Sequence, residues 1–127
     1  MADTQQRLQA LSTQYDAVQQ ELQSYVSSRQ KLESQQHENK AVQKEFSGLK
    51  DDANIYKLVG PVLLKQDRTE AVLAVDGRLE YIDNEIQRVE KQIKEAEDKT
   101  DALRAQIIQV QADAAPQGQG PQAQVAA

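Results

Sequence analysis

The most constraining feature of the sequence is a long run of mainly apolar residues spaced alternately three and four apart. The run comprises Val72, Val75, Leu79, Ile82, Ile86, Val89, Ile93, Ala96, Thr100, Leu103, Ile107 and Val110. Such heptad spacing is typical of a long helix that buries one narrow seam against a partner helix. Asp67 precedes the run and Glu70 follows three residues later, which is the arrangement of a helix N-cap. We therefore predict a helix over residues 68–113.

The first half of the chain carries a similar but less regular seam, and it predicts a helix over residues 4–52. The seam begins with Leu8, Leu11, Tyr15, Val18, Leu22, Tyr25 and Leu32. It then continues one residue out of step, through Gln35, Asn39, Val42, Phe46 and Leu49. We interpret the change as a phase slip around Gln35–Asn39, which is either a hinge or a device that sets register.

The segment between the two predicted helices has a different pattern. Residues 55–66 read Ile-Tyr-Lys-Leu-Val-Gly-Pro-Val-Leu-Leu-Lys-Gln, two short apolar runs around Gly60-Pro61. Gly accepts the positive φ of a tight turn and Pro restricts the next φ, so we predict a β-hairpin. The fold class is thus mainly α: a long antiparallel two-helix coiled coil with one β-hairpin at the connecting end. Residues 1–113 form this domain, and the Pro, Gly, Gln and Ala residues of 114–127 predict a disordered tail.

Composition excludes several classes of function. The chain has no cysteine, 4% aromatic residues and a formal net charge of −5, and no two of its basic residues are adjacent. Nucleic-acid and anionic membrane surfaces are recognised by clustered Lys and Arg, so neither is an expected partner. Residues 1–11 are mainly polar and contain no continuous apolar segment, and no apolar run is long enough to cross a bilayer, so we expect a cytoplasmic location.

The predicted hairpin implies assembly. An isolated two-stranded hairpin is marginally stable in water, and exposed strand edges and apolar patches are normally covered. We therefore expect other chains to cover this one. The predicted assembly residues are Ile55, Tyr56, Leu58, Val59, Gly60, Pro61, Val62, Leu63 and Leu64.

The order long helix, IYKLVGPVLLKQD, then a second long helix beginning TEAVLAVDGRLEYIDNEI, resembles a β-class prefoldin subunit, most like eukaryotic subunit 6. The resemblance covers nearly the whole chain, and its specific part is residues 55–86. It implies a heterohexamer with two α-class and three further β-class subunits, joined through their hairpins. It also implies an ATP-independent co-chaperone that captures unfolded proteins such as actin and tubulin and delivers them to the cytosolic group II chaperonin.

Client binding would fall to the helix ends opposite the hairpin. The candidate residues are Leu8, Leu11, Leu103, Ile107, Ile108 and Val110. Ile108 lies beside the seam, whereas the others are seam residues that also close the coiled coil. Helix ends fray, so the two roles can coexist.

Other classes of function agree less well with the sequence. No catalytic constellation is present, so we expect no enzyme activity, and a lone His37 supports no metal site. No cofactor is expected. A tethering coiled coil in another hetero-oligomer explains the heptads but not the hairpin. An RNA-binding helical arm is opposed by the acidic balance. The acidic residues Glu95, Glu97, Asp98 and Asp101 form either a solvated helix face or a contact for a basic patch on the chaperonin.

Overall fold

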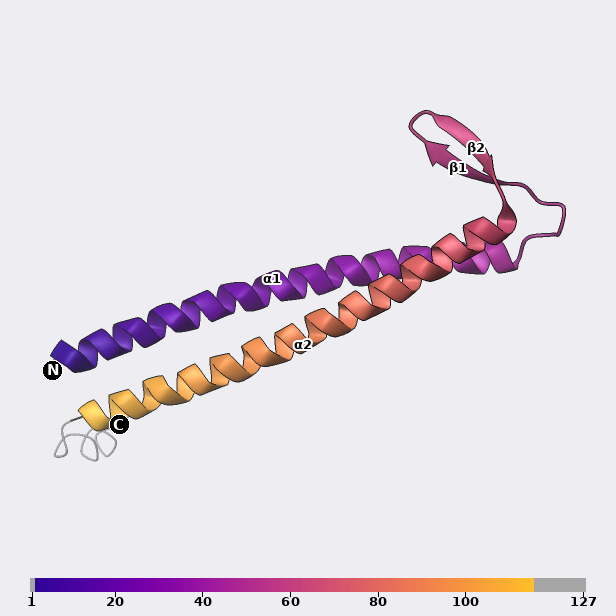
Figure 1. Ribbon diagram of the computed structural model, residues 1–127. Helices are drawn as coiled ribbons and strands as arrows, with labels where there is room; N and C mark the ends of the chain where they lie inside the picture. The colour runs from indigo at the N-terminus through magenta and orange to yellow at the C-terminus, as the bar shows by residue number, and fades with distance from the viewer. Residues whose placement is uncertain (1, 116–127) are drawn as a thin grey trace, which may run out of the picture. The chain divides into compact units, whose positions relative to one another are not determined.

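The computed structural model describes residues 2–115 and contains two long helices with one hairpin between them. Helix α1 (Ala2–Ser47) is followed by strands β1 (Ile55–Val59) and β2 (Val62–Gln66) and by helix α2 (Arg68–Ala114) (Figure 1). The predicted fold class is confirmed. Residues 116–127, most of the predicted disordered tail, lie outside the described residues, and Ala114 is the last residue of α2.

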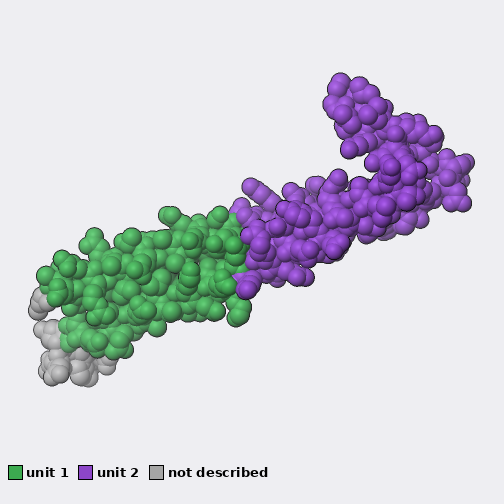
Figure 2. All heavy atoms as spheres, viewed as in Figure 1, with its two compact units in different colours: residues 1–25, 92–127 green, residues 26–91 purple. Residues whose placement is uncertain are grey.

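The chain divides into two compact units (Figure 2). One unit contains residues 1–25 and 92–127, and the other contains residues 26–91, which include the hairpin. In the hairpin-containing unit α1 and α2 run antiparallel, because contacts that move forward along α1 move backward along α2. Gln36 donates a hydrogen bond to Asp83 and Gln43 donates one to Asp76. A step of one heptad forward along α1 is therefore a step of one heptad backward along α2.

The buried residues of the helix pair lie on α2. They are Ala71, Val75, Leu79, Ile82, Val89, Ile93, Ala96, Thr100 and Val110. From Val75 onward these are predicted seam residues, as heptad packing requires. Near the start of α2 the buried position is Ala71, whereas the predicted Val72 is half-buried. Among residues 2–47, by contrast, α1 buries no side chain fully.

The predicted phase slip in α1 is wrong. Its half-buried positions keep the three-four alternation through Tyr25, Arg29, Leu32, Gln36, Asn39 and Phe46. Gln43 occupies the remaining heptad position; it is exposed, and its amide donates to Asp76 at 2.9 Å. Val42 is 40% exposed and Gln35 is exposed. The alternation continues because polar residues occupy several of its positions. The prediction favoured an apolar residue, Val42, and so moved out of step with the seam.

The ends of the helices have local causes. The side chain of Asp67 accepts a hydrogen bond from the Glu70 amide at 3.1 Å, and its carbonyl accepts from Ala71 at 2.9 Å. This is the predicted N-cap of α2. Helix α1 ends at Ser47 rather than at the expected residue 52. The next residue is Gly48, which has low helix propensity.

The hairpin has the register expected for a two-residue turn, with Val59 opposite Val62 and Ile55 opposite Gln66. Gly60 has φ +58°, and Pro61 follows it at the second central position. A glycine with positive φ in the first central position is characteristic of a type II′ turn, whose twist matches that of the strands. Among the described residues, Gly60 alone has a positive φ.

Candidate assembly surface and helix tips

The hairpin exposes most of its apolar side chains. Tyr56, Leu58, Val59, Val62, Leu63 and Leu64 are between 48% and 68% exposed. Strand alternation divides them between both faces, so neither face is covered. Of the predicted assembly residues, Ile55 is the one that is buried; it is the first residue of β1. The hairpin therefore presents an apolar surface on both sides.

The hairpin also leaves two strand edges without backbone partners within the described chain. Its sheet contains two strands, β1 and β2. Since Val59 and Val62 flank a two-residue turn, they form a hydrogen-bonded pair, and the pairing alternates from there. The backbone groups of Tyr56 and Leu58 on β1, and of Leu63 and Lys65 on β2, consequently point outward. These groups can pair with a strand of another chain.

Arg68, the first residue of α2, bonds the start of α2 to the end of α1 and to the segment that follows α1. Its guanidinium donates to the carbonyl oxygens of Lys50 at 2.9 Å, Leu49 at 3.0 Å and Phe46 at 3.2 Å. These carbonyls lie at and just beyond the end of α1, where helical carbonyls lack partners within the helix. The sequence analysis identified Asp67 as a cap but did not identify Arg68. Only the antiparallel return of the chain brings Arg68 to these oxygens.

The six candidate tip residues all belong to the unit of residues 1–25 and 92–127. Leu8, Leu11, Leu103 and Ile107 are half-buried, and Val110 is buried. Ile108 is 59% exposed, as its position beside the seam predicted. Of the six, Ile108 is the one that offers most of its side chain to a partner without any opening of the helix pair.

A cross-helix contact that the sequence analysis did not identify lies in the same unit. The Arg104 guanidinium donates to the Tyr15 hydroxyl at 3.1 Å and lies 5.9 Å from the centre of the Tyr15 ring. The pKa of Tyr15 is lowered mainly by the hydrogen bond from Arg104 and further by a hydrogen bond with Gln19. The bond to Tyr15 raises the pKa of Arg104 in turn. Tyr15 was a predicted seam residue, but its polar partner is apparent only from the helix pairing.

The hairpin-containing unit has its own polar cross-helix contacts. The amides of Gln36 and Gln43 donate to Asp83 and Asp76, and Arg78 donates to the Asn39 side chain at 3.3 Å. All three hydrogen bonds are exposed to solvent, so water can replace a lost partner and each bond adds little to stability. They show that the polar stretch of α1 faces α2.

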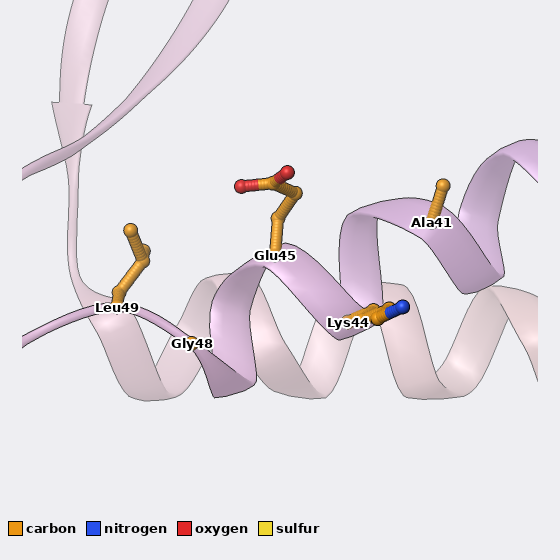
Figure 3. A pocket seen from close by; sticks show the side chains of 5 residues that line it. All are labelled: Ala41, Lys44, Glu45, Gly48 and Leu49. Carbon is orange, nitrogen blue, oxygen red and sulfur yellow. The ribbon is translucent and has the colours of Figure 1, made fainter.

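Two of the surface hollows among the described residues lie on the helix pair. One, of about 370 Å³, lies beside the end of α1 and is lined by Ala41, Lys44, Glu45, Gly48 and Leu49 (Figure 3). Figure 3 shows Ala41, Glu45 and Leu49 pointing to the same side of the helix. Across the described residues, no group of three or more His, Cys, Asp or Glu side chains could hold a metal ion. In that same part of the chain, no helix is long and apolar enough to cross a membrane.

A second hollow, of about 420 Å³, lies in the unit that carries the tip residues. It is lined by Gln19, Leu22, Lys94, Glu97, Asp98, Thr100, Asp101 and Arg104. Its charged residues are of both signs. Thr100 is 5% exposed, and its hydroxyl has no hydrogen-bond partner among the described residues. The seam of α2 thus contains an unpaired polar group close to the candidate tip residues.

These features define a class of protein: a two-helix antiparallel coiled-coil subunit with a single uncovered β-hairpin between its helices. The prefoldin subunit family profile matches residues 9–114. The chain is similar to prefoldin subunit 6 of Saccharomyces cerevisiae, with 42% identity over 110 residues covering 87% of this chain and 96% of that protein. Human prefoldin subunit 6 is 39% identical over 107 residues, covering 84% of this chain and 83% of its own length.

A solved structure supports the same assignment. The crystal structure of the prefoldin beta subunit from Thermococcus strain KS-1 matches with a TM-score of 0.76 and 32% identity, covering 87% of this chain and 94% of that one. The chain belongs to the prefoldin family of chaperone subunits. The resemblance inferred from residues 55–86 is confirmed.

Proposed function

We propose that this chain is one subunit of a cytoplasmic hetero-oligomeric co-chaperone, in which the hairpin joins it to other prefoldin subunits and the helix ends hold unfolded proteins. The companions would be two α-class and three further β-class subunits. The clients, including actin and tubulin, would pass to the group II chaperonin without ATP hydrolysis or a bound cofactor. Family membership supports the chaperone role.

The observation that carries the proposal is the uncovered hairpin. Six of its apolar side chains are about half or more exposed, and the outward backbone groups of both strands lack partners in the described chain. A surface of this kind is normally covered by another chain, and strand addition at open edges covers the backbone and side chains together. A coiled coil that acted only as a spacer would not need an exposed apolar hairpin.

The assembly role is tested by replacing Leu58 and Leu63, which lie opposite each other on one face of the hairpin. The variant Leu58→Asp/Leu63→Asp should keep its helical circular dichroism spectrum but fail to enter the hetero-oligomer in native mass spectrometry. Tyr81→Asp is the matched control, because Tyr81 is 63% exposed on α2 and outside the hairpin. Normal hetero-oligomers containing the double variant would refute the proposed interface.

The client-holding role is tested separately on the assembled complex. Removing residues 1–11 and 103–127 should leave assembly intact but abolish suppression of the aggregation of chemically unfolded actin. Ile108→Asp is the finer test, since Ile108 is the most exposed of the tip candidates. It should weaken the suppression while Tyr81→Asp leaves it unchanged. Full holding activity in the truncated complex would contradict the tip assignment.

A further inference from the structure

The two attachments of the hairpin to the helices are unequal. A single residue, Asp67, separates β2 from α2, whereas residues 48–54 separate α1 from β1. Within this longer connector the backbone bonds are local: Leu49 donates to Phe46 at 3.3 Å, and Ala53 donates to Lys50 at 3.0 Å. Local turns of this kind do not hold a segment against the rest of the fold. Leu49 and Ala53 are half-buried and Ile55 is buried, so apolar packing also holds this segment. A side-chain contact from α2 adds to that packing.

Arg68 supplies that contact. Its three hydrogen bonds end on Phe46, Leu49 and Lys50, which include the last turn of α1 and the beginning of the connector. The planar guanidinium presents several donors in a fixed geometry, so one side chain can hold several carbonyls at once. Its positive charge also suits the C-terminal end of a helix dipole. Asp67 caps the start of α2 as Arg68 caps the end of α1.

We propose that Arg68 is a positioning residue for assembly: it holds the α1 side of the hairpin in place so that both strands are presented to partner strands in one orientation. The inference rests on the proposed role of the hairpin as the assembly interface. Without these bonds the connector samples more conformations, and the fraction of chains ready to pair falls. The apparent dissociation constant rises in inverse proportion to that fraction.

The test uses the full chain with its companion subunits and the variant Arg68→Met, which keeps an unbranched side chain but removes every donor. Arg88→Met is the matched control, because Arg88 lies on the same helix and donates to Glu85 of that helix rather than to α1 or the connector. If about one variant chain in ten keeps the connector ordered, assembly weakens about tenfold. Arg88→Met should stay within about twofold of the original chain.

Two further measurements separate positioning from general destabilisation. Hydrogen exchange at the amides of Leu49 and Ala53 should accelerate in Arg68→Met at a temperature where the helical circular dichroism signal is unchanged. Arg68→Lys, which restores a cation with several donors, should recover part of the assembly affinity. If Arg68→Met loses its helical circular dichroism signal, Arg68→Lys is compared with the original chain instead. The proposal then requires Arg68→Lys to assemble more weakly than the original chain.

The outcomes separate this inference from the function on which it rests. Unchanged assembly of Arg68→Met, with Leu58→Asp/Leu63→Asp unable to assemble, would overturn the role of Arg68 and retain the hairpin interface. Normal assembly of the double variant would overturn the interface itself. Equal losses in Arg68→Met and Arg88→Met would also overturn the positioning role, because they would reflect a general effect of removing an arginine.

Discussion

The unpaired hydroxyl of Thr100 allows a specific prediction about the stability of the helix pair. Thr100 is buried in the α2 seam, and its hydroxyl has no hydrogen-bond partner among the described residues. Burying an unpaired hydroxyl costs about 1–3 kcal/mol by comparison with protein mutational data. Thr100→Val replaces the hydroxyl with a methyl group of similar shape. We expect the free energy of unfolding to rise by about 1–2 kcal/mol, because the substitution removes most of this cost.

Urea unfolding followed by circular dichroism measures this change directly. In a domain of about 100 residues, 1 kcal/mol corresponds to roughly 4–8 °C in Tm, so thermal unfolding is an independent check. Thr13→Val is the matched control, since Thr13 is exposed on α1 and its hydroxyl donates to the Gln9 carbonyl at 2.9 Å. The control should change stability by less than about 0.5 kcal/mol. Unchanged or reduced stability in Thr100→Val would refute the reasoning.

The same substitution tests whether client holding requires the helix ends to separate. Thr100 lies in the unit that carries the tip residues, including the half-buried Leu103 and Ile107. If opening exposes Thr100, a gain of 1–2 kcal/mol lowers the open population about five- to thirtyfold. Suppression of actin aggregation by the complex should then weaken although no exposed side chain has changed. Undiminished holding by a stabilised complex would show that opening at Thr100 is not required.

Three further predictions concern the hairpin, the register and pH. Leu58→Asp/Leu63→Asp should weaken assembly by at least about 2–4 kcal/mol, because each leucine exposes roughly two-thirds of a side chain whose full burial contributes about 1.5–3 kcal/mol; a titration of companion subunits measures this. Val42→Asn should cost less than about 1 kcal/mol, whereas Ile82→Asn should cost about 2–5 kcal/mol; equal losses on urea unfolding would support the rejected phase slip. The lowered pKa of Tyr15 adds stability above the unfolded-state pKa, near 10, and this is lost as pH falls through the folded-state pKa. The Tm difference between the original chain and Tyr15→Phe should therefore widen as pH rises toward 10.

The sequence predicts α2 well because nearly every seam position of that helix is apolar. Periodicity alone then identifies both the helix and the face it buries, from Val75 to Val110. The hairpin was equally accessible, since its turn depends on Gly60 and Pro61, which are adjacent in the sequence. In both cases the information needed lies within one short segment or one repeated pattern.

The features that the sequence analysis missed depend on residues far apart in the chain. The predicted seam followed Gln35 rather than Gln36, because Asp83, the partner of Gln36, is on the other helix. The role of Arg68 was not predicted, because its acceptors precede the hairpin. A polar residue is assigned to an interface only when its partner is known, and that partner depends on the antiparallel register.

The uneven burial of the two helices connects stability with assembly. Among the described residues α2 contributes the fully buried side chains of the helix pair, whereas α1 contributes half-buried and polar ones. The hydrogen bonds of Gln36 and Gln43 to Asp83 and Asp76 are exposed to solvent, so they add little to the stability of the helix pair. On the α1 side the hairpin is thus joined to the less buried helix, and Arg68 bonds that side to the start of α2. Under the proposed role of Arg68, its loss would weaken assembly more than it weakens the helix pair.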